Sequence, residues 1–193
     1  MLNKRIALWL KISYTLMVLV IVPVYWHEYG SKNFLWFCDI GMIVILLALW
    51  LESRLLTSMM ALGVLPLEMF WFVGFFTGGG VFSTADYMFD RSLPLYLRAL
   101  SFYHFPMPAV TIFMLMKFKY DKRALPLQIG LVTILLPVTR WLTPASENIN
   151  WVFPPEILSF LPTYLYIAIM IATLVTLVYI PMHFVLKKYF PIN

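Results

Sequence analysis

The chain is dominated by apolar runs that are each long enough to cross a bilayer, and only short polar segments separate them. A membrane-spanning helix needs roughly 20 apolar residues, and irregular backbone is not tolerated where it faces hydrocarbon. Of the 193 residues, 62% are hydrophobic and 12% are charged, which is about half the charged fraction of soluble domains. This pattern excludes a water-soluble globular domain. It predicts an all-α, polytopic membrane helical bundle.

Hydropathy predicts six transmembrane helices in one transmembrane domain that covers residues 1–193. The first run follows basic residues, as a signal peptide does, but it ends in Tyr25 and Trp26 without a small-residue cleavage pattern. Aromatic residues at that position are typical of a retained helix anchored at the membrane surface. The six predicted spans are Leu8 to Tyr25, Phe34 to Leu51, Leu55 to Phe76, Leu93 to Met116, Leu125 to Leu142 and Leu161 to Leu186.

The basic residues predict the orientation, because cytoplasmic segments of membrane proteins are enriched in lysine and arginine. Six spans place both termini on one side, and most basic residues lie in the segments on that side. We therefore predict an inner (plasma) membrane protein with both termini inside. Scattered in short turns, these cations form no patch for nucleic acid. The inner segments hold Lys4, Arg5, Lys11, Arg54, Lys117, Lys119, Lys122, Arg123, Lys187 and Lys188, and the outer ones hold Lys32, Arg91, Arg98 and Arg140.

Of the ionisable side chains inside the predicted spans, five are candidates for a functional site, namely Asp39, Glu68, Arg98, His104 and Arg140. A charge at the centre of a membrane helix costs roughly 2.5 to 3.5 kcal/mol, so each is a candidate functional residue. Counted at about 1.5 Å per residue, the first four lie in the outer half of the membrane or at its midplane. Since helices of opposite direction bring them to one depth, we expect a shared polar pocket with Arg140 as a second cation.

For hydrolysis or acyl transfer, His104 is the candidate base, and Asp39 or Glu68 would orient it. Ser101 lies three residues before His104 on the same predicted helix and is the candidate nucleophile. A serine bonded back to its own helix is the more common arrangement. The catalytic candidates are therefore His104, Asp39 and Ser101.

The remaining candidates would bind a substrate rather than react with it. They come from the spans and from the outer loop before the last span, which we expect to fold over the pocket as a lid. Prolines at 66, 106 and 108 are expected to kink the helices at the depth of the pocket. The substrate-binding candidates are Glu68, Arg98, Arg140, Asn148, Asn150 and Trp151.

No metal site and no cofactor are predicted. The three histidines lie at different depths, and a mixed site of His104, Asp39 and Glu68 lacks the spacing of a metal motif. Cys38 is the single cysteine, so it has no partner for a disulfide or a Cys-pair metal site. Cys38 is more simply interpreted as a small buried apolar residue.

Three hypotheses for the function remain open. The first is a pocket, open to the outer leaflet, that binds and hydrolyses a lipid or another amphiphile, so that membrane lipids are the partners. The second is a structural or assembly protein, in which Arg98 pairs with Asp39 or Glu68 to hold the bundle. The third is a small proton-coupled carrier that uses one of these acids. The sequence identifies no protein partner.

Four segments carry a resemblance to a family of uncharacterised bacterial six-helix integral inner-membrane proteins, which implies a location and no activity. The layout is also distantly similar to the androgen-induced family of six-helix membrane lipid hydrolases. His104 matches that family's histidine in the fourth helix, but Trp36 stands where its threonine nucleophile would be, so this resemblance implies topology alone. The four segments are Tyr29–Asp39, Tyr87–Asp90, Arg98–His104 and Glu147–Phe153.

Overall fold

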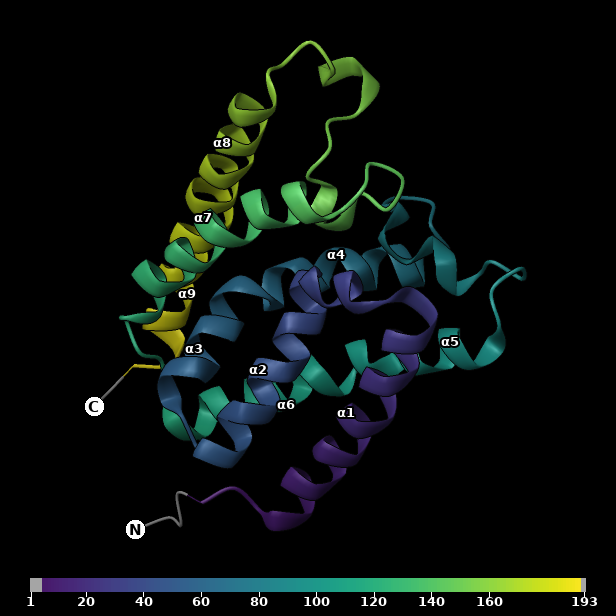
Figure 1. The fold of residues 1–193 in the computed structure, drawn as a ribbon. Helices are drawn as coiled ribbons and strands as arrows, with labels where there is room; N and C mark the ends of the chain where they lie inside the picture. The colour runs from purple at the N-terminus through teal and green to yellow at the C-terminus, as the bar shows by residue number, and fades with distance from the viewer. Residues whose placement is uncertain (1–4, 192–193) are drawn as a thin grey trace.

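The computed structural model describes residues 5–191, which form helices and no strand, so the all-α prediction is confirmed (Figure 1). The α-helices are α1 (Leu8–Tyr29), α2 (Phe37–Leu51), α3 (Arg54–Gly63), α4 (Leu65–Phe76), α5 (Leu95–Leu100), α6 (Pro106–Phe118), α7 (Ala124–Leu142), α8 (Thr163–Thr173) and α9 (Ile180–Tyr189). The 3₁₀ helices are η1 (Ser31–Leu35), η2 (Ser83–Met88), η3 (Ser101–His104), η4 (Ile149–Trp151) and η5 (Glu156–Leu158), and a π-helical segment, η6 (Leu174–Tyr179), joins α8 to α9.

Several helices have the length and apolar character of membrane spans, which indicates a membrane protein. Within residues 5–191, four qualify outright, and α3 with α4 makes a fifth if this pair, bent by 45°, is one span. Large apolar side chains are exposed along them, as in Trp141 at 84% and Leu177 at 71%, and such surfaces mark contact with lipid or protein. The four are α1 (Leu8–Tyr29), the continuous run of α5, η3 and α6 (Leu95–Phe118), α7 (Ala124–Leu142), and the continuous run of α8, η6 and α9 (Thr163–Tyr189).

Prolines interrupt two of the predicted spans. Pro66 stands in the first turn of α4, where its missing N–H costs nothing, and the preceding helix α3 ends at Gly63. Pro106 likewise opens α6, directly after the tight turn η3. The expected kinks are therefore present as a 45° bend between α3 and α4 and as a 3₁₀ turn within Leu95–Phe118, and each lies near an ionisable residue.

The second predicted span is the one that differs most from its expected form. Residues 31–35 form η1, Trp36 is extended with φ −59° and ψ 138°, and only Phe37–Leu51 is α-helical. With 15 residues, α2 is shorter than the helices that qualify as spans.

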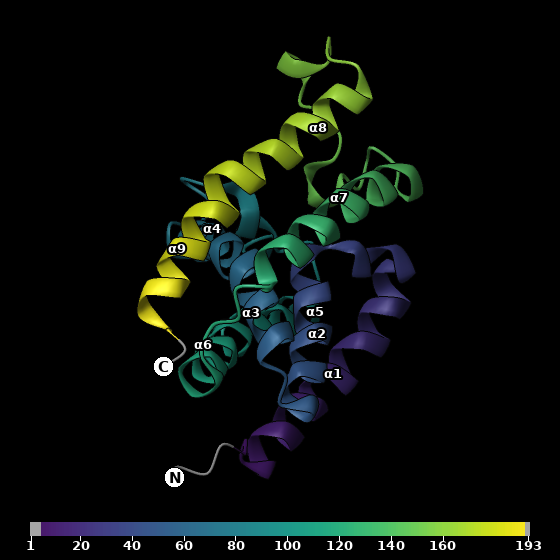
Figure 2. The ribbon, with the colours of Figure 1, turned by 90° about the vertical axis from the view of Figure 1, so that its left-hand side faces the viewer.

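Helix α3 lies at the centre and packs against α2, α6 and α7 (Figures 1 and 2). The start of α1, the end of α6 and the end of α9 meet at one end of the molecule. Lys117 donates to the backbone oxygen of Arg5, and the Tyr120 amide donates to the Phe190 carbonyl at 2.9 Å. We call this the basic end, because most of the basic residues predicted to lie inside are here; Lys4 lies outside the described residues.

Candidate functional site

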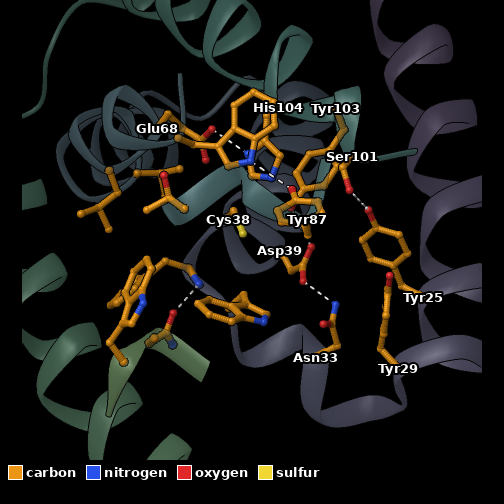
Figure 3. Close-up of a pocket in the computed structure, with 18 of the residues that line it drawn as sticks. Tyr25, Tyr29, Asn33, Cys38, Asp39, Glu68, Tyr87, Ser101, Tyr103 and His104 are labelled. Atoms are coloured by element: carbon orange, nitrogen blue, oxygen red, sulfur yellow. Dashed lines mark hydrogen bonds and ion pairs between the residues drawn. The ribbon is translucent and has the colours of Figure 1, made fainter. Parts of the chain in front are cut away.

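A pocket of about 410 Å³ opens at the end of the bundle opposite the basic end. Figure 3 shows the residues that line it. Its walls come from the end of α1, η1, the start of α2, the first turns of α4, and the 3₁₀ helices η2, η3 and η4. The helix breaks described above therefore lie around the pocket. Apolar and aromatic side chains make up most of its lining, with a few polar groups between them, as in small-molecule sites.

A buried acid and histidine form the first polar contact of the pocket. His104 Nδ1 lies 2.7 Å from Glu68 Oε2, and these side chains are 7% and 4% exposed. The imidazole is stacked between Trp71 and Tyr103, with ring centroids 4.4 Å and 4.3 Å away. Glu68 stands in the first turn of α4, where the helix dipole favours a carboxylate. The arrangement fixes the ring and leaves Nε2 as the nitrogen not used in this bond.

Asp39 forms the second polar contact, and its partners are both neutral. Tyr103 Oη donates to Asp39 Oδ1 at 2.9 Å, and Asn33 Nδ2 donates to Oδ2 at 2.8 Å. The carboxylate lies in the first turn of α2 and is 2% exposed as a residue. Tyr103 and His104 are neighbours in η3, so this one tight turn holds both acids of the pocket through Asp39 and Glu68.

Ser101 lines the pocket, but its hydrogen bonds lead away from His104. Its hydroxyl lies 2.8 Å from Tyr25 Oη and donates to the Leu97 carbonyl at 3.3 Å. The hydrogen bonds of the described residues include none between Ser101 and His104. The serine thus fastens η3 to α1, and the predicted contact between nucleophile and base is absent from the described part of the chain.

The loop between α7 and α8, which the sequence analysis expected to act as a lid, contributes Asn150 and Trp151 to the lining of the pocket. Asn150 Oδ1 accepts from the Phe37 amide at 3.0 Å, and Asn150 Nδ2 donates to the Leu35 carbonyl at 2.7 Å. One side chain therefore satisfies a free N–H at the start of α2 and fixes the loop there. Trp151 also lines the pocket and packs edge-on against Trp36 with ring centroids 5.6 Å apart.

Unlike Asn150 and Trp151, Asn148 does not line the pocket. It stabilises the conformation of the loop. Its side chain accepts from the Phe153 amide at 2.8 Å and donates to the Phe153 carbonyl at 3.3 Å. Its φ of 38° is in the left-handed region, which asparagine tolerates better than most residues.

The two predicted cations lie outside the pocket lining. Arg98 Nη1 donates to the Met88 carbonyl at 3.3 Å, and the described ion pairs include none between Arg98 and either pocket acid. Arg98 lies in α5, and its guanidinium is held at the end of η2 by the Met88 carbonyl, so it does not share the pocket wall with His104. Arg140 instead stacks on the Phe153 ring, 3.9 Å from its centroid.

Several pocket residues escaped the sequence analysis because aromatic side chains in a membrane protein suggest interface anchors first. Tyr25, Trp71 and Tyr103 carry hydrogen bonds or stack on the histidine. Tyr87 accepts from Trp71 Nε1 at 3.0 Å, and burial raises the pKa of this phenol in η2, which keeps it protonated. The one available signal was sequence proximity, since Tyr103 adjoins His104.

Within residues 5–191, no three His, Cys, Asp or Glu side chains lie together as a metal site would require. Comparisons with protein-family models, with characterised proteins and with solved structures find no match to this chain. Fold and site together define an all-helical protein with apolar helices of membrane-spanning length and a largely aromatic pocket containing two buried acids.

Proposed function

We propose that this chain is a six-span inner-membrane protein whose pocket faces the outer leaflet and binds the polar end of a lipid or another amphiphile. The basic end, with the start of α1 and the end of α9, would face the cytoplasm, in accord with the lysine and arginine distribution. The sixth span would be α2 extended by η1.

The observation that carries the proposal is the cavity beside His104. A purely structural role for the ionisable residues predicts a filled interior held by an Arg98 ion pair. The geometry has neither feature, since the cavity measures about 410 Å³ and Arg98 bonds a carbonyl. An apolar pocket with a few convergent polar groups is the usual form of a site for an amphiphile.

The test is to identify and count the amphiphile that remains bound to the purified protein in nanodiscs. Wild type is compared with Asp39→Asn and His104→Gln by mass spectrometry at matched folded fractions. Thr111→Val is the control, because Thr111 is buried and polar but bonds only its own helix at the Met107 carbonyl, outside the pocket. Retention by wild type and the control, with loss in the pocket variants, supports the proposal; equal retention by all four refutes it.

Hydrolysis of the bound amphiphile is a second candidate, favoured by the 2.7 Å contact between His104 and Glu68. A histidine oriented by a carboxylate is suited to accept a proton from a nucleophile. Because Ser101 bonds Tyr25 and its own helix, the nucleophile would be a water molecule. Release of fatty acid that His104→Gln abolishes and Ser101→Ala retains is the expected result. Loss in Ser101→Ala would instead identify a serine nucleophile, and no release by wild type would exclude hydrolysis.

A further inference from the structure

Among the described residues, no lysine or arginine side chain lines the pocket. Its ionisable carboxylates are Asp39 and Glu68, and its one imidazole is His104. The nearby cations Arg98 and Arg140 bond a carbonyl and a ring outside the lining. The pocket therefore offers no fixed positive charge to an anionic head group.

Asp39 is the pocket acid that makes no ion pair with another described residue. Glu68 has the imidazole of His104 at 2.7 Å. Asp39 is bonded only by the neutral groups of Asn33 and Tyr103. A buried carboxylate without a counter-charge is costly. A ligand that brings a positive charge to the pocket would remove this cost.

The aromatic lining favours the same class of ligand independently of the acids. Ring faces carry negative electrostatic potential and attract ammonium groups, most of all when water is excluded. Tyrosines and tryptophans surround the acids from four elements, and Figure 3 shows Tyr25, Tyr29 and Tyr87 among them. Trp71 and Tyr103 are stacked on His104, and the other tyrosines and tryptophans of the lining are Tyr25, Tyr29, Trp36, Tyr87 and Trp151.

We infer that the pocket selects amphiphiles whose polar end is a protonated amine or a quaternary ammonium group, with Asp39 as the counter-ion. This inference rests on the proposed function and specifies its ligand class. A head group of this kind satisfies the buried carboxylate and contacts the aromatic rings at the same time. An anionic head group would instead place a negative charge beside the Asp39 carboxylate.

The experiment compares three amphiphiles that share a decyl chain and differ in the head group, which is trimethylammonium, maltoside or phosphate. Each is titrated into wild type in nanodiscs of a non-ionic glycolipid, with empty nanodiscs correcting for partition, and tryptophan fluorescence gives Kd. We expect the trimethylammonium compound to bind about tenfold tighter than the maltoside, and the phosphate to bind weakest. This series needs no variant, so it remains decisive if a pocket variant fails to fold.

Asp39→Asn should weaken binding of the trimethylammonium compound about tenfold and leave the maltoside unchanged. Asp90→Asn is the control, since Asp90 is exposed in the loop before α5 and its removal changes the charge without touching the lining. Equal binding of the three head groups, tightest binding of the phosphate, or equal effects of both substitutions overturns the inference while the proposed function stands. If none of the three amphiphiles binds wild type, both fail.

Discussion

At the scale of single residues, the two acids of the pocket are stabilised in different ways. Glu68 has a titratable partner, whereas Asp39 accepts from a phenol and an amide. A carboxylate that loses its buried partner keeps its desolvation cost. The two sites should therefore respond differently to substitution, although both lie against the same turn, η3.

The buried pair of His104 and Glu68 should show strong energetic coupling. His104→Gln removes the ring and should lower the free energy of unfolding by about 1–3 kcal/mol, because Glu68 keeps its buried charge without the ring. Adding Glu68→Gln replaces that charge with a neutral amide and should recover part of the loss. The measurement is a double-mutant cycle on unfolding in mixed micelles. Additive effects of the two substitutions would contradict the coupling.

The basic end contains an acid whose stabilising effect should depend on pH. Arg123 binds Asp121 at 2.8 Å, with Arg54 at 3.3 Å on the same carboxylate. The Arg123 hydrogen bond lowers the pKa of Asp121 from 3.8 to about 2. Because the folded-state pKa is depressed, the stabilisation is complete above the ordinary value of 3.8 and is lost as the pH falls from there to about 2.

Asp121→Asn should accordingly lower the free energy of unfolding at pH 6 by on the order of 1 kcal/mol, a value that allows for solvent screening of the exposed Arg123. Wild type and variant should converge as the pH falls below about 2, where Asp121 is protonated in both the folded and unfolded states. Unfolding measured across this pH series checks the expectation. A stability difference that stays constant down to the lowest pH would show that the charge has no part in it.

At the scale of elements, a close approach between α4 and the following loop forms one wall of the pocket. A Cβ at Gly74 would lie 2.7 Å from the Phe82 backbone oxygen and 2.7 Å from Thr84 Oγ1. Thr84 also donates to the Phe70 carbonyl at 2.8 Å and lines the pocket. Since the obstacle includes backbone, a side chain at this position must displace the loop.

Gly74→Ala should therefore destabilise the protein by about 1–3 kcal/mol and weaken amphiphile binding, because the loop forms part of the lining. Gly130→Ala is the matched control, since a Cβ at this position in α7 would meet nothing within 4 Å. Alanine should there stabilise the helix by up to about 1 kcal/mol. Thermal unfolding and ligand titration of both variants provide the comparison. Equal behaviour of the two would show that the contact at Gly74 is unimportant.

The helical segments were predictable because long apolar runs leave few alternatives in a membrane. The positions at which these helices are interrupted were predictable, because Pro66 and Pro106 mark them. The local backbone conformation at each interruption was not. Whether a proline kinks a helix or ends it depends on packing against other elements, and hydropathy does not record that packing. The short α2 has the same cause, because Trp36 leaves the helical conformation to pack against Trp151 across the loop.

Sequence predicts how deep a side chain lies in the membrane better than it predicts which face of a helix carries that side chain. Equal depth predicted that Asp39, Glu68, Arg98 and His104 would share one pocket, and the lining contains all of these except Arg98. Depth does not say which face of α5 carries Arg98, and the tight turn η3 changes the rotation directly after it. The same limitation applies to Ser101, which lies near His104 in sequence but bonds a tyrosine of α1.

At the scale of the whole molecule, the proposed topology places the basic end in the cytoplasm and the pocket on the outer side. Green fluorescent protein fused to the C-terminus should fluoresce, and alkaline phosphatase fused there should be inactive. Alkaline phosphatase inserted after Gly79, in the loop beside the pocket, should be active. Activity of the C-terminal phosphatase fusion would contradict the topology. Inactivity of the loop insertion, in a protein still folded and inserted, would contradict it equally.

The central claim is that an amphiphile occupies the pocket, and photo-crosslinking tests it most directly. A decyltrimethylammonium probe with a diazirine beside the head group is irradiated with wild type in nanodiscs, and the labelled peptides are mapped by mass spectrometry. The account predicts labels on lining residues such as Tyr29, Trp36 and Tyr87, which excess unlabelled amphiphile removes. Labels confined to exposed helix faces such as Trp141 and Leu177, with none in the pocket, would contradict it.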